Sequence, residues 1–371
     1  MITRISRLNL IKVCLISFFA LTIFGQAKAQ SQITSFVQIA QPNGNKILQA
    51  YADPFMKRQA DGWADGWTNT AAHEKLSFQL FSLSGTFVDN NEKTFDASTL
   101  GLDPNVIRVH GSPINQTVSG GQNNTGAAFD LYAKNPYTGE PLKVATVAGA
   151  NGMNLHLGGI SIVPTIVTPQ LGFGFSSGTE VMVRLIPDIH YSSNTEVTVV
   201  GLGLKQNLSD LIFHKKDQGI KAIVPFDLAV YTGYSMENIN YKLDVQPDPT
   251  EKRTSGNENT NYNNQKINVK TTNYTVGAII SKKILFLTPH AGIAYSASQT
   301  TLGVLGTYPT QEITKTGMTI KNVQDPLLII GQNSGMSANI GLNLNVFFVK
   351  LSTDLIVGKY DRMNVSLRVA F

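Results

Sequence analysis

The last ten residues, Arg362–Phe371, constrain the fold more than any other segment. Their side chains alternate between an apolar and a polar set. The apolar set consists of Met363, Val365, Leu367, Val369 and Phe371. Successive side chains of a β-strand point to opposite faces, so this segment predicts a strand with one face fit for lipid and one fit for water.

The same alternation recurs upstream in 226–234, 336–346 and 349–357. Runs of about ten residues with a single lipid-compatible face are the signature of membrane barrels. Further strand candidates are 76–88, 128–133, 142–148, 153–163, 169–176, 179–187, 195–205, 267–280 and 284–298. We therefore predict an all-β fold, an antiparallel transmembrane β-barrel of about 12–14 strands. An aromatic C-terminal residue on the apolar face resembles the sorting signal of bacterial outer-membrane barrels.

Composition agrees with a barrel. Charged residues make up 15% of the chain, against about 25% in ordinary soluble domains. After the first 29 residues no long apolar run appears, so the sequence predicts no transmembrane helix. The single cysteine, Cys14, lies in that first segment, and the remainder therefore has neither disulfides nor thiolate metal sites.

Residues 1–29 have the three parts of a secretory signal peptide. Basic residues come first, an apolar run from Val13 to Gly25 follows, and Ala27-Lys28-Ala29 ends the segment. Without its four basic residues the chain has 26 basic and 25 acidic side chains. A nearly neutral mature protein gives no support for binding nucleic acid. We expect export to the outer membrane, with lipid as the surrounding partner.

Residues 30–74 do not alternate like strands. Apolar residues recur there at helical spacing from Ile47 to Met56, and Pro54 should kink or limit the helix. We predict a short helical plug or hatch inside the barrel 75–371. The plug carries Phe55 and both tryptophans, Trp63 and Trp67. The two tryptophans either lie near a ligand path, or they pack the plug against the wall or mark the interface belt, and the second interpretation is favoured.

The sequence contains no convincing catalytic or metal motif. Gly174–Gly178 matches G-x-S-x-G, but a strand follows instead of the helix that a nucleophile elbow needs. His190 and Ser192 resemble the H-x-S pair of barrel phospholipases, without the rest of that motif. The other histidines are scattered. We predict no enzyme activity, no cofactor and no metal, and keep a barrel lipase as a remote alternative.

Charged residues of inward parity mark the predicted lumen. Arg184 alternates with Val183 and Leu185, so it faces inward if they face lipid. Lys350, Asp354 and Arg368 have the same parity. They either select or orient a ligand or form mutually paired charges in a solvated wall, and the second is favoured. The candidate ligand contacts are Phe55, Trp63, Trp67 and Arg184.

Several short motifs resemble an uncharacterised Bacteroidota family of outer-membrane barrels. They are Tyr51-x-x-Pro54, Gly66-Trp67, Thr70-Ala71, Lys93-Thr94-Phe95-Asp96, Gly178-Thr179-Glu180 with Arg184 and Pro187, and Gly201-x-Gly203. That family is distantly similar to the barrels that transport long-chain fatty acids. The resemblance implies about fourteen strands and an N-terminal hatch.

The leading functional prediction is passage of a small hydrophobic or amphipathic molecule through a plugged barrel. The alternative is a surface or scaffold barrel that does not transport and contacts partners through the loops 246–266 and 299–334. No residue pattern identifies the transported molecule or a protein partner.

Overall fold

The computed structural model describes residues 42–371, except 124–125, 168, 191–192, 210–225, 248–251, 254–260 and 316. The predicted signal segment 1–29 and the first part of the predicted plug, up to residue 41, lie outside the described residues. Within the described part, no helix combines the length and apolarity needed to cross a bilayer.

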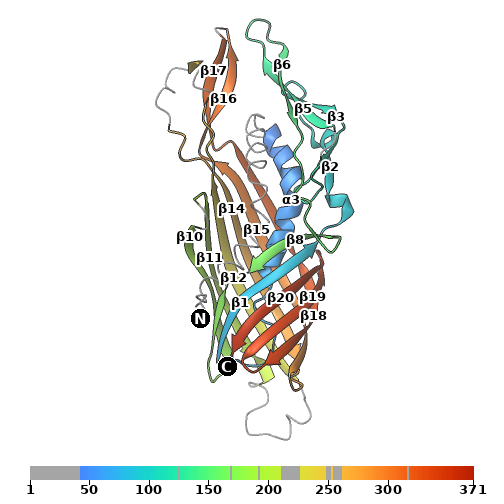
Figure 1. Ribbon diagram of the computed structural model, residues 1–371, viewed down its shortest axis with the longest axis vertical. Coiled ribbons are helices and arrows are strands. Elements are labelled where there is room, and N and C mark those ends of the chain that lie inside the picture. The colour runs from blue at the N-terminus through green and yellow to red at the C-terminus, as the bar shows by residue number, and fades with distance from the viewer. Residues whose placement is uncertain are drawn as a thin grey trace, which may run out of the picture.

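The architecture is a closed antiparallel β-barrel with one long helix inside it (Figure 1). The wall elements are β1 (Leu76–Phe87), β8 (Ile160–Val167), β9 (Gln170–Gly174), β10 (Thr179–His190), β11 (Thr195–Asn207), β12 (Asp227–Lys242), β14 (Lys266–Ser281), β15 (Leu287–Leu305), β18 (Leu327–Val346), β19 (Val349–Gly358) and β20 (Arg362–Ala370). Pairing of β1 with β20 closes the ring. Closure leaves no free sheet edge across most of the wall.

In the described part of the chain the wall contains ten strand positions, which corrects the predicted range of about 12–14. β9 pairs with the first half of β1, and β8 pairs with the second half. The candidates 153–163 and 169–176 therefore occupy a single strand position in the wall. The candidates 128–133 and 142–148 belong to a separate three-stranded sheet outside the wall. Alternation does not distinguish a wall strand from a strand in a loop domain, because both have one buried face.

The two ends of the barrel differ. At the end that holds Phe371, here named the turn end, short turns join β14 to β15 and β18 to β19. At the opposite loop end stand small sheets formed by β2 (Thr94–Asp96), β3 (Ile107–Gly111), β4 (Ile114–Gln116), β5 (Ala127–Lys134), β6 (Pro141–Ala148), β7 (His156–Leu157), β13 (Lys252–Arg253), β16 (Thr307–Thr314) and β17 (Gly317–Gln324), with the 3-10 turns η1 (Asn90–Glu92) and η2 (Ala97–Leu100). This asymmetry matches the expected arrangement of loops and turns.

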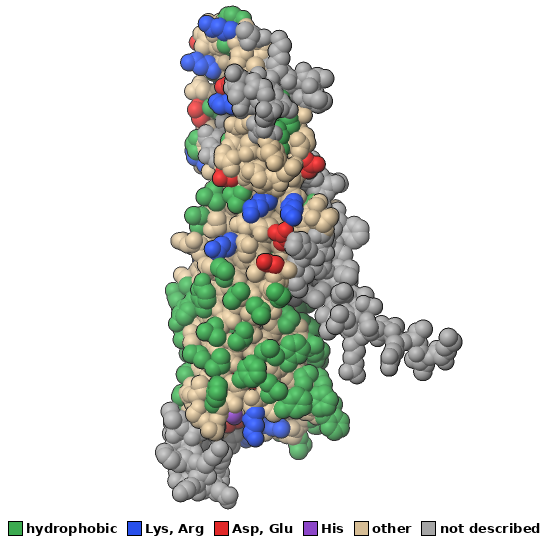
Figure 2. Space-filling model, turned by 90° about the vertical axis from the view of Figure 1, so that its left-hand side faces the viewer, with side chains coloured by type: hydrophobic (Ala, Val, Ile, Leu, Met, Phe, Trp, Pro, Cys, Tyr) green, Lys and Arg blue, Asp and Glu red, His purple; other side chains and the backbone are tan. Residues whose placement is uncertain are grey.

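On the face in Figure 2, apolar side chains cover the lower barrel below a band of charged side chains. Exposed apolar residues lie on the other wall strands as well, and together they form an apolar belt. Its members are outward residues of the wall strands, such as Leu202, Ile340 and Leu355, each about half exposed in the isolated chain. Their inward neighbours are polar: Ser84, Ser352 and Ser366 are buried in the lumen. The alternation read from Arg362–Phe371 is therefore confirmed, and the fold is that of a transmembrane barrel.

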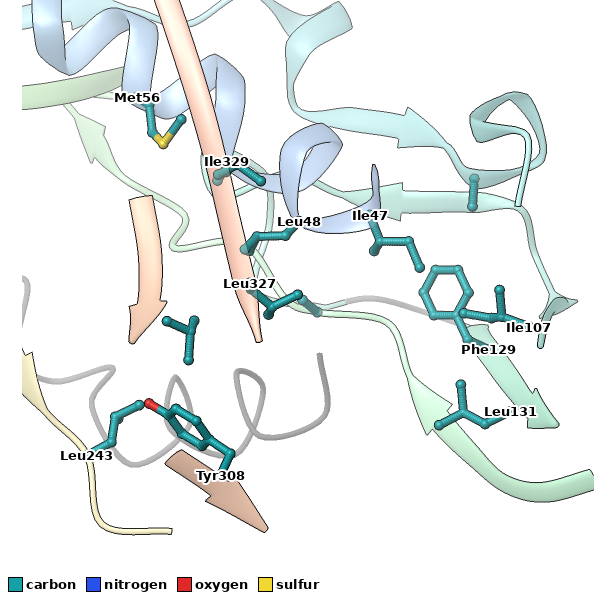
Figure 3. Close-up of a cluster of buried hydrophobic side chains, with 14 residues drawn as sticks. Ile47, Leu48, Met56, Ile107, Phe129, Leu131, Leu243, Tyr308, Leu327 and Ile329 are labelled. Atoms are coloured by element: carbon teal, nitrogen blue, oxygen red, sulfur yellow. The ribbon is translucent and has the colours of Figure 1, made fainter. Parts of the chain in front are cut away.

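The helix α3 (Asn43–Ala64) runs from the loop end into the lumen (Figure 1). It continues through Pro54, which corrects the expectation that this residue would limit it. Packing on several sides offsets the roughly 3 kcal/mol that proline costs inside a helix. The first half of α3 lies in an apolar core that includes Ile47, Leu48, Phe129 and Leu327, shared with the loop-end sheets (Figure 3).

Candidate functional site

Below α3 the chain continues as an extended segment that descends through the lumen to β1. We name residues 43–75 the plug segment. The turn after the helix depends on Gly66, whose φ of +73° is one that other residues rarely adopt. A Cβ there would also lie 2.8 Å from the Ser82 hydroxyl oxygen. Glycine at this position therefore lets the plug run close to β1.

Arg184, on β10, fixes this turn to the wall. Its guanidinium donates to the backbone oxygens of Trp63 (3.1 Å) and Asp65 (2.6 Å) and to the side-chain oxygen of Gln170 (3.0 Å). Gln170 in turn donates to the backbone oxygen of Trp67 (3.0 Å). Arg184 is fully buried. A buried cation is tolerated here because three acceptors surround it.

The indole of Trp67 packs directly on two glycines of the wall. Gly203 of β11 and Gly233 of β12 are directly paired across the strands. A Cβ on Gly233 would lie 2.2 Å from the indole, and one on Gly203 would lie 2.7 Å from it. On the ring of Trp67 lies Arg184, with its guanidinium carbon 3.7 Å from the ring centroid. The indole is thus held between a flat patch of backbone and a cation.

A second wall arginine binds the plug from β20, on the other side of β1 from β10. Arg362 of β20 donates through two nitrogens to the two oxygens of Asp65, at 2.7 and 2.8 Å. The hydroxyl of Ser84 donates to the same carboxylate at 2.9 Å. Both members of the pair are buried, and the two-pronged geometry supplies direction as well as attraction.

The plug ends in an ion cluster at the turn end. Glu74 pairs with Lys350 and with Arg368 (3.4 Å), and its backbone N–H donates to Glu180 (2.7 Å). Lys205 bridges Glu180 (2.8 Å) and the backbone oxygen of Ala72 (3.0 Å). Burial alone would raise the pKa of the Glu74 carboxyl. The charges of Arg368, Lys350 and Lys205 outweigh burial and lower this pKa to about 2.

One patch of the lumen is apolar. Trp63 packs against Val197 and Val199 of β11, beside the partly buried Ile186 of β10 and Ile239 of β12. Trp63 is 7% exposed and Val199 is fully buried. We name these five residues the apolar cluster. It stands next to polar lumen residues such as Ser235 and Glu237.

The apolar cluster lies beside a discontinuity in the wall. β10 pairs with β9 only from Glu180 to Arg184, and β8 pairs with β1 and β7. Among the described residues, no backbone pairing joins β8 to the upper part of β10. We name this stretch, Ile160–Val167 facing Leu185–His190, the seam.

Local features of the sequence explain the seam. Pro187 has no N–H to donate to a neighbouring strand. The pairing of β10 with β11 also shifts register between Ile186 and Ile189. On the other side α3 holds β8 from within. The hydroxyl of Thr165 donates to the backbone oxygen of Gln59 (3.3 Å), and a Cβ on Gly62 would lie 2.5 Å from that hydroxyl. β8 is thus supported by the helix where it lacks a strand.

The described plug leaves little free space in the lower lumen. A cavity of about 50 Å³ lies beneath the turn at Gly66, lined by polar groups that include Asp65, Asn69, Asp354 and Arg362. That volume holds only a few water molecules. This cavity is therefore too small for a molecule much larger than water.

The structure brings three of the four predicted site residues together. Trp63, Trp67 and Arg184 meet at the turn between α3 and the extended plug, whereas Phe55 lies higher on α3 and is half-buried. Whether they contact a ligand stays a prediction. The side chain of His190 and residues 191–192 lie outside the described residues. Of the predicted lumen charges, Lys350 and Arg368 pair with Glu74 of the plug and Asp354 contacts His290 of the wall, whereas Arg184 binds neutral acceptors.

Sequence reasoning missed several residues of this site. Asp65 and Glu74 stand in a segment without periodicity, and nothing in their spacing indicates a partner about 290 residues away. Val197 and Val199 break the polar inward parity of their strand, which was the one available signal for the apolar cluster. The motif Gly201-x-Gly203 is visible in the sequence, but the sequence does not indicate that the indole of Trp67 packs on Gly203.

The fold and the lumen define the class: a membrane β-barrel closed by an internal N-terminal plug. The chain belongs to a family of unknown function (DUF6588), whose model matches residues 8–371. A comparison with curated proteins found no match.

Solved structures with some likeness are bacterial barrels. They include the outer membrane transporter YddB from Escherichia coli, with 11% identity over 80% of this chain and a TM-score of 0.28. This chain spans only 41% of that transporter. The translocator domain of the autotransporter NalP from Neisseria meningitidis shows 9% identity over 90% of this chain and 98% of that one, with a TM-score of 0.26. The toluene transporter TbuX from Ralstonia pickettii shows 10% identity over 85% of this chain and 93% of that one, with a TM-score of 0.17.

Proposed function

We propose that this protein resides in the bacterial outer membrane, with its turn end toward the periplasm, after export by the segment 1–29. We further propose that it lets small hydrophobic or amphipathic molecules pass between its interior and the bilayer through the seam. The apolar belt and the asymmetry of loops and turns support the location and orientation. The proposal includes no enzymatic step and no cofactor.

The apolar cluster beside the seam is the observation that carries the proposed passage. Straight transit along the lumen is disfavoured, because the plug is hydrogen-bonded to the wall inside it and the lining is polar and charged. Lateral transit needs no broken strand pairing at the seam, whereas parting any other two wall strands would expose unpaired backbone groups to lipid. The seam begins at Leu185, an outward residue of the belt that is 56% exposed.

An uptake assay tests this proposal. Cells or liposomes that contain the protein should accumulate a fluorescent fatty acid or a small aromatic compound faster than those without it. Val199→Asp places a carboxylate in the apolar cluster and should reduce the rate to that of empty membrane, whereas the matched control Val199→Ala should retain most of it. Equal uptake with the protein and with empty membrane contradicts transport.

A second candidate function is a surface scaffold that binds a partner at the loop end. The observation that favours it is the edge strand β6, on which Leu142 and Val144 are 44% and 45% exposed. Leu142→Lys with Val144→Lys should then abolish capture of a surface partner while leaving uptake unchanged. Capture that survives this double substitution counts against the scaffold.

A further inference from the structure

The outer face of the wall has a groove on β12, β14, β15 and β18, away from the seam between β8 and β10. It has a volume of about 480 Å³, and its lining includes Tyr234, Tyr274, Tyr295, Gln299, Gln332 and Lys359. Five of these side chains belong to the outward parity of the wall strands, and Lys359 follows directly after β19. The lining also includes the buried Asn333, which donates to Asp61 of the plug. The groove is separate from the apolar cluster and the seam.

The level of the groove is set by the register of the strands. Tyr234 pairs with Tyr274, and one step toward the loop end Thr272 pairs with Gln299, which pairs with Gln332. Below the tyrosines the outward residues are apolar, with Val276, Ile293 and Met336 exposed. Toward the loop end the outward residues of β14 and β15 are polar, whereas β18 stays apolar through Ile330 and Leu328. On β14 and β15 the groove therefore lies at the upper boundary of the apolar belt, where lipid headgroups meet the wall.

The lining has the chemistry of a sugar site. Three tyrosines, between 39% and 51% exposed, offer flat aromatic faces. The apolar C–H faces of a pyranose ring pack on such surfaces. Gln299 and Gln332, joined by a hydrogen bond of 3.0 Å, present amide groups that both donate to and accept from hydroxyls. Lys359 is the one cation in the lining, which is few for a site built to hold phosphate.

We propose that this groove binds the saccharide headgroup of a glycolipid in the outer leaflet, with its acyl chains lying on the apolar belt below. The proposal rests on the membrane orientation proposed above but not on transport. A belt of interfacial tyrosines alone would anchor any lipid without preference. Selection for a sugar headgroup distinguishes the groove from such a belt.

Binding to the full-length mature protein in neutral detergent tests the proposal. The probes are a neutral glycosyl diacylglycerol and phosphatidylglycerol of the same acyl chains, and bound lipid is counted by native mass spectrometry. The glycolipid should bind more tightly than phosphatidylglycerol. Tyr234→Ala with Tyr274→Ala should weaken glycolipid binding by about tenfold or more, because two stacking faces are lost. Gln299→Ala should weaken it while the outer aromatic surface is kept.

Phe81→Ala is the matched control, since Phe81 is an outward aromatic residue, 40% exposed, on the distant strand β1. It should bind glycolipid like the unaltered protein. Heat-modifiable migration on gels verifies that each variant is folded. The proposal is overturned if the tyrosine variant binds as before, or if no glycolipid binds. It is also overturned if phosphatidylglycerol binds equally well and only Lys359→Ala weakens it, which would identify a charge site. None of these outcomes depends on uptake.

Discussion

Replacing Arg184 by methionine should release the plug from the wall. The substitution preserves much of the side-chain volume but removes three charge-assisted hydrogen bonds, two of them to backbone oxygens of the plug. At about 1.5–3 kcal/mol each, these bonds set an upper bound of roughly 5–9 kcal/mol. Water in the lumen can satisfy part of the loss, so we expect destabilisation of the docked plug by about 3–5 kcal/mol.

Trp63 and Trp67 are the only tryptophans of the chain, and both lie in the plug. Their fluorescence therefore reports plug docking, while far-ultraviolet circular dichroism reports the barrel. With a urea slope of about 1 kcal/mol/M for so small a unit, the plug transition should fall by about 3 M or more. The tryptophan emission should shift to longer wavelength before the barrel unfolds.

Arg184→Lys should also weaken docking, because an ammonium group cannot match the planar fork of the guanidinium. Arg108→Met, at an exposed arginine of β3, is the control and should leave both transitions in place. An unchanged emission maximum and an unchanged midpoint in Arg184→Met would refute the idea that this arginine clamps the plug.

Three further predictions concern the same plug. Gly233→Ala should displace Trp67 at a cost of about 1–3 kcal/mol and red-shift its emission, because the new Cβ would lie 2.2 Å from the indole. The control Gly335→Ala should have no effect, because the nearest atom to its new Cβ would be 3.6 Å away. Asp65→Asn should lower the plug transition by about 3 kcal/mol, since it removes the two-pronged carboxylate partner of the buried Arg362 and leaves only Asp61, 3.7 Å away. It should also produce ion conductance in planar bilayers where the unaltered protein shows none; Glu140→Gln, at an exposed acid, serves as the control. Acid should loosen the turn end of the plug: the pKa of Glu74 lies at about 2 in the folded protein, below its ordinary value near 4.5, so its stabilising effect is complete above pH 4.5 and is lost as the pH falls toward 2. Glu74→Gln should remove this pH dependence, and a plug transition that stays constant from pH 7 to 2.5 would contradict it.

The wall could be predicted from the sequence because each strand carries its own signal. The alternation of Met363, Val365 and Leu367 needs no knowledge of the neighbouring strands, and the structure places them all outward. The number of wall strands was overestimated, because β5 and β6 alternate like wall strands while they cover the apolar core at the loop end.

The site is harder to predict, because it depends on contacts between distant segments. Arg184 could be assigned to the lumen by parity, but its partners Trp63 and Asp65 follow only from the path of the plug. The seam is a stretch without pairing between β8 and β10, and Pro187 is the one local signal for it in the sequence. Helical spacing from Ile47 to Met56 identified the start of α3. It did not show that the helix continues to Ala64, because packing against the wall decides that.

Photolabelling tests the proposed lateral passage most directly. A fatty acid that carries a diazirine would be bound to the protein in membranes, activated by light, and its attachment sites mapped by mass spectrometry. We predict labels inside the barrel on Trp63, Ile186 and Val199, and their loss in Val199→Asp. Labels confined to the outer belt, on residues such as Leu202 and Ile340, would contradict entry through the seam.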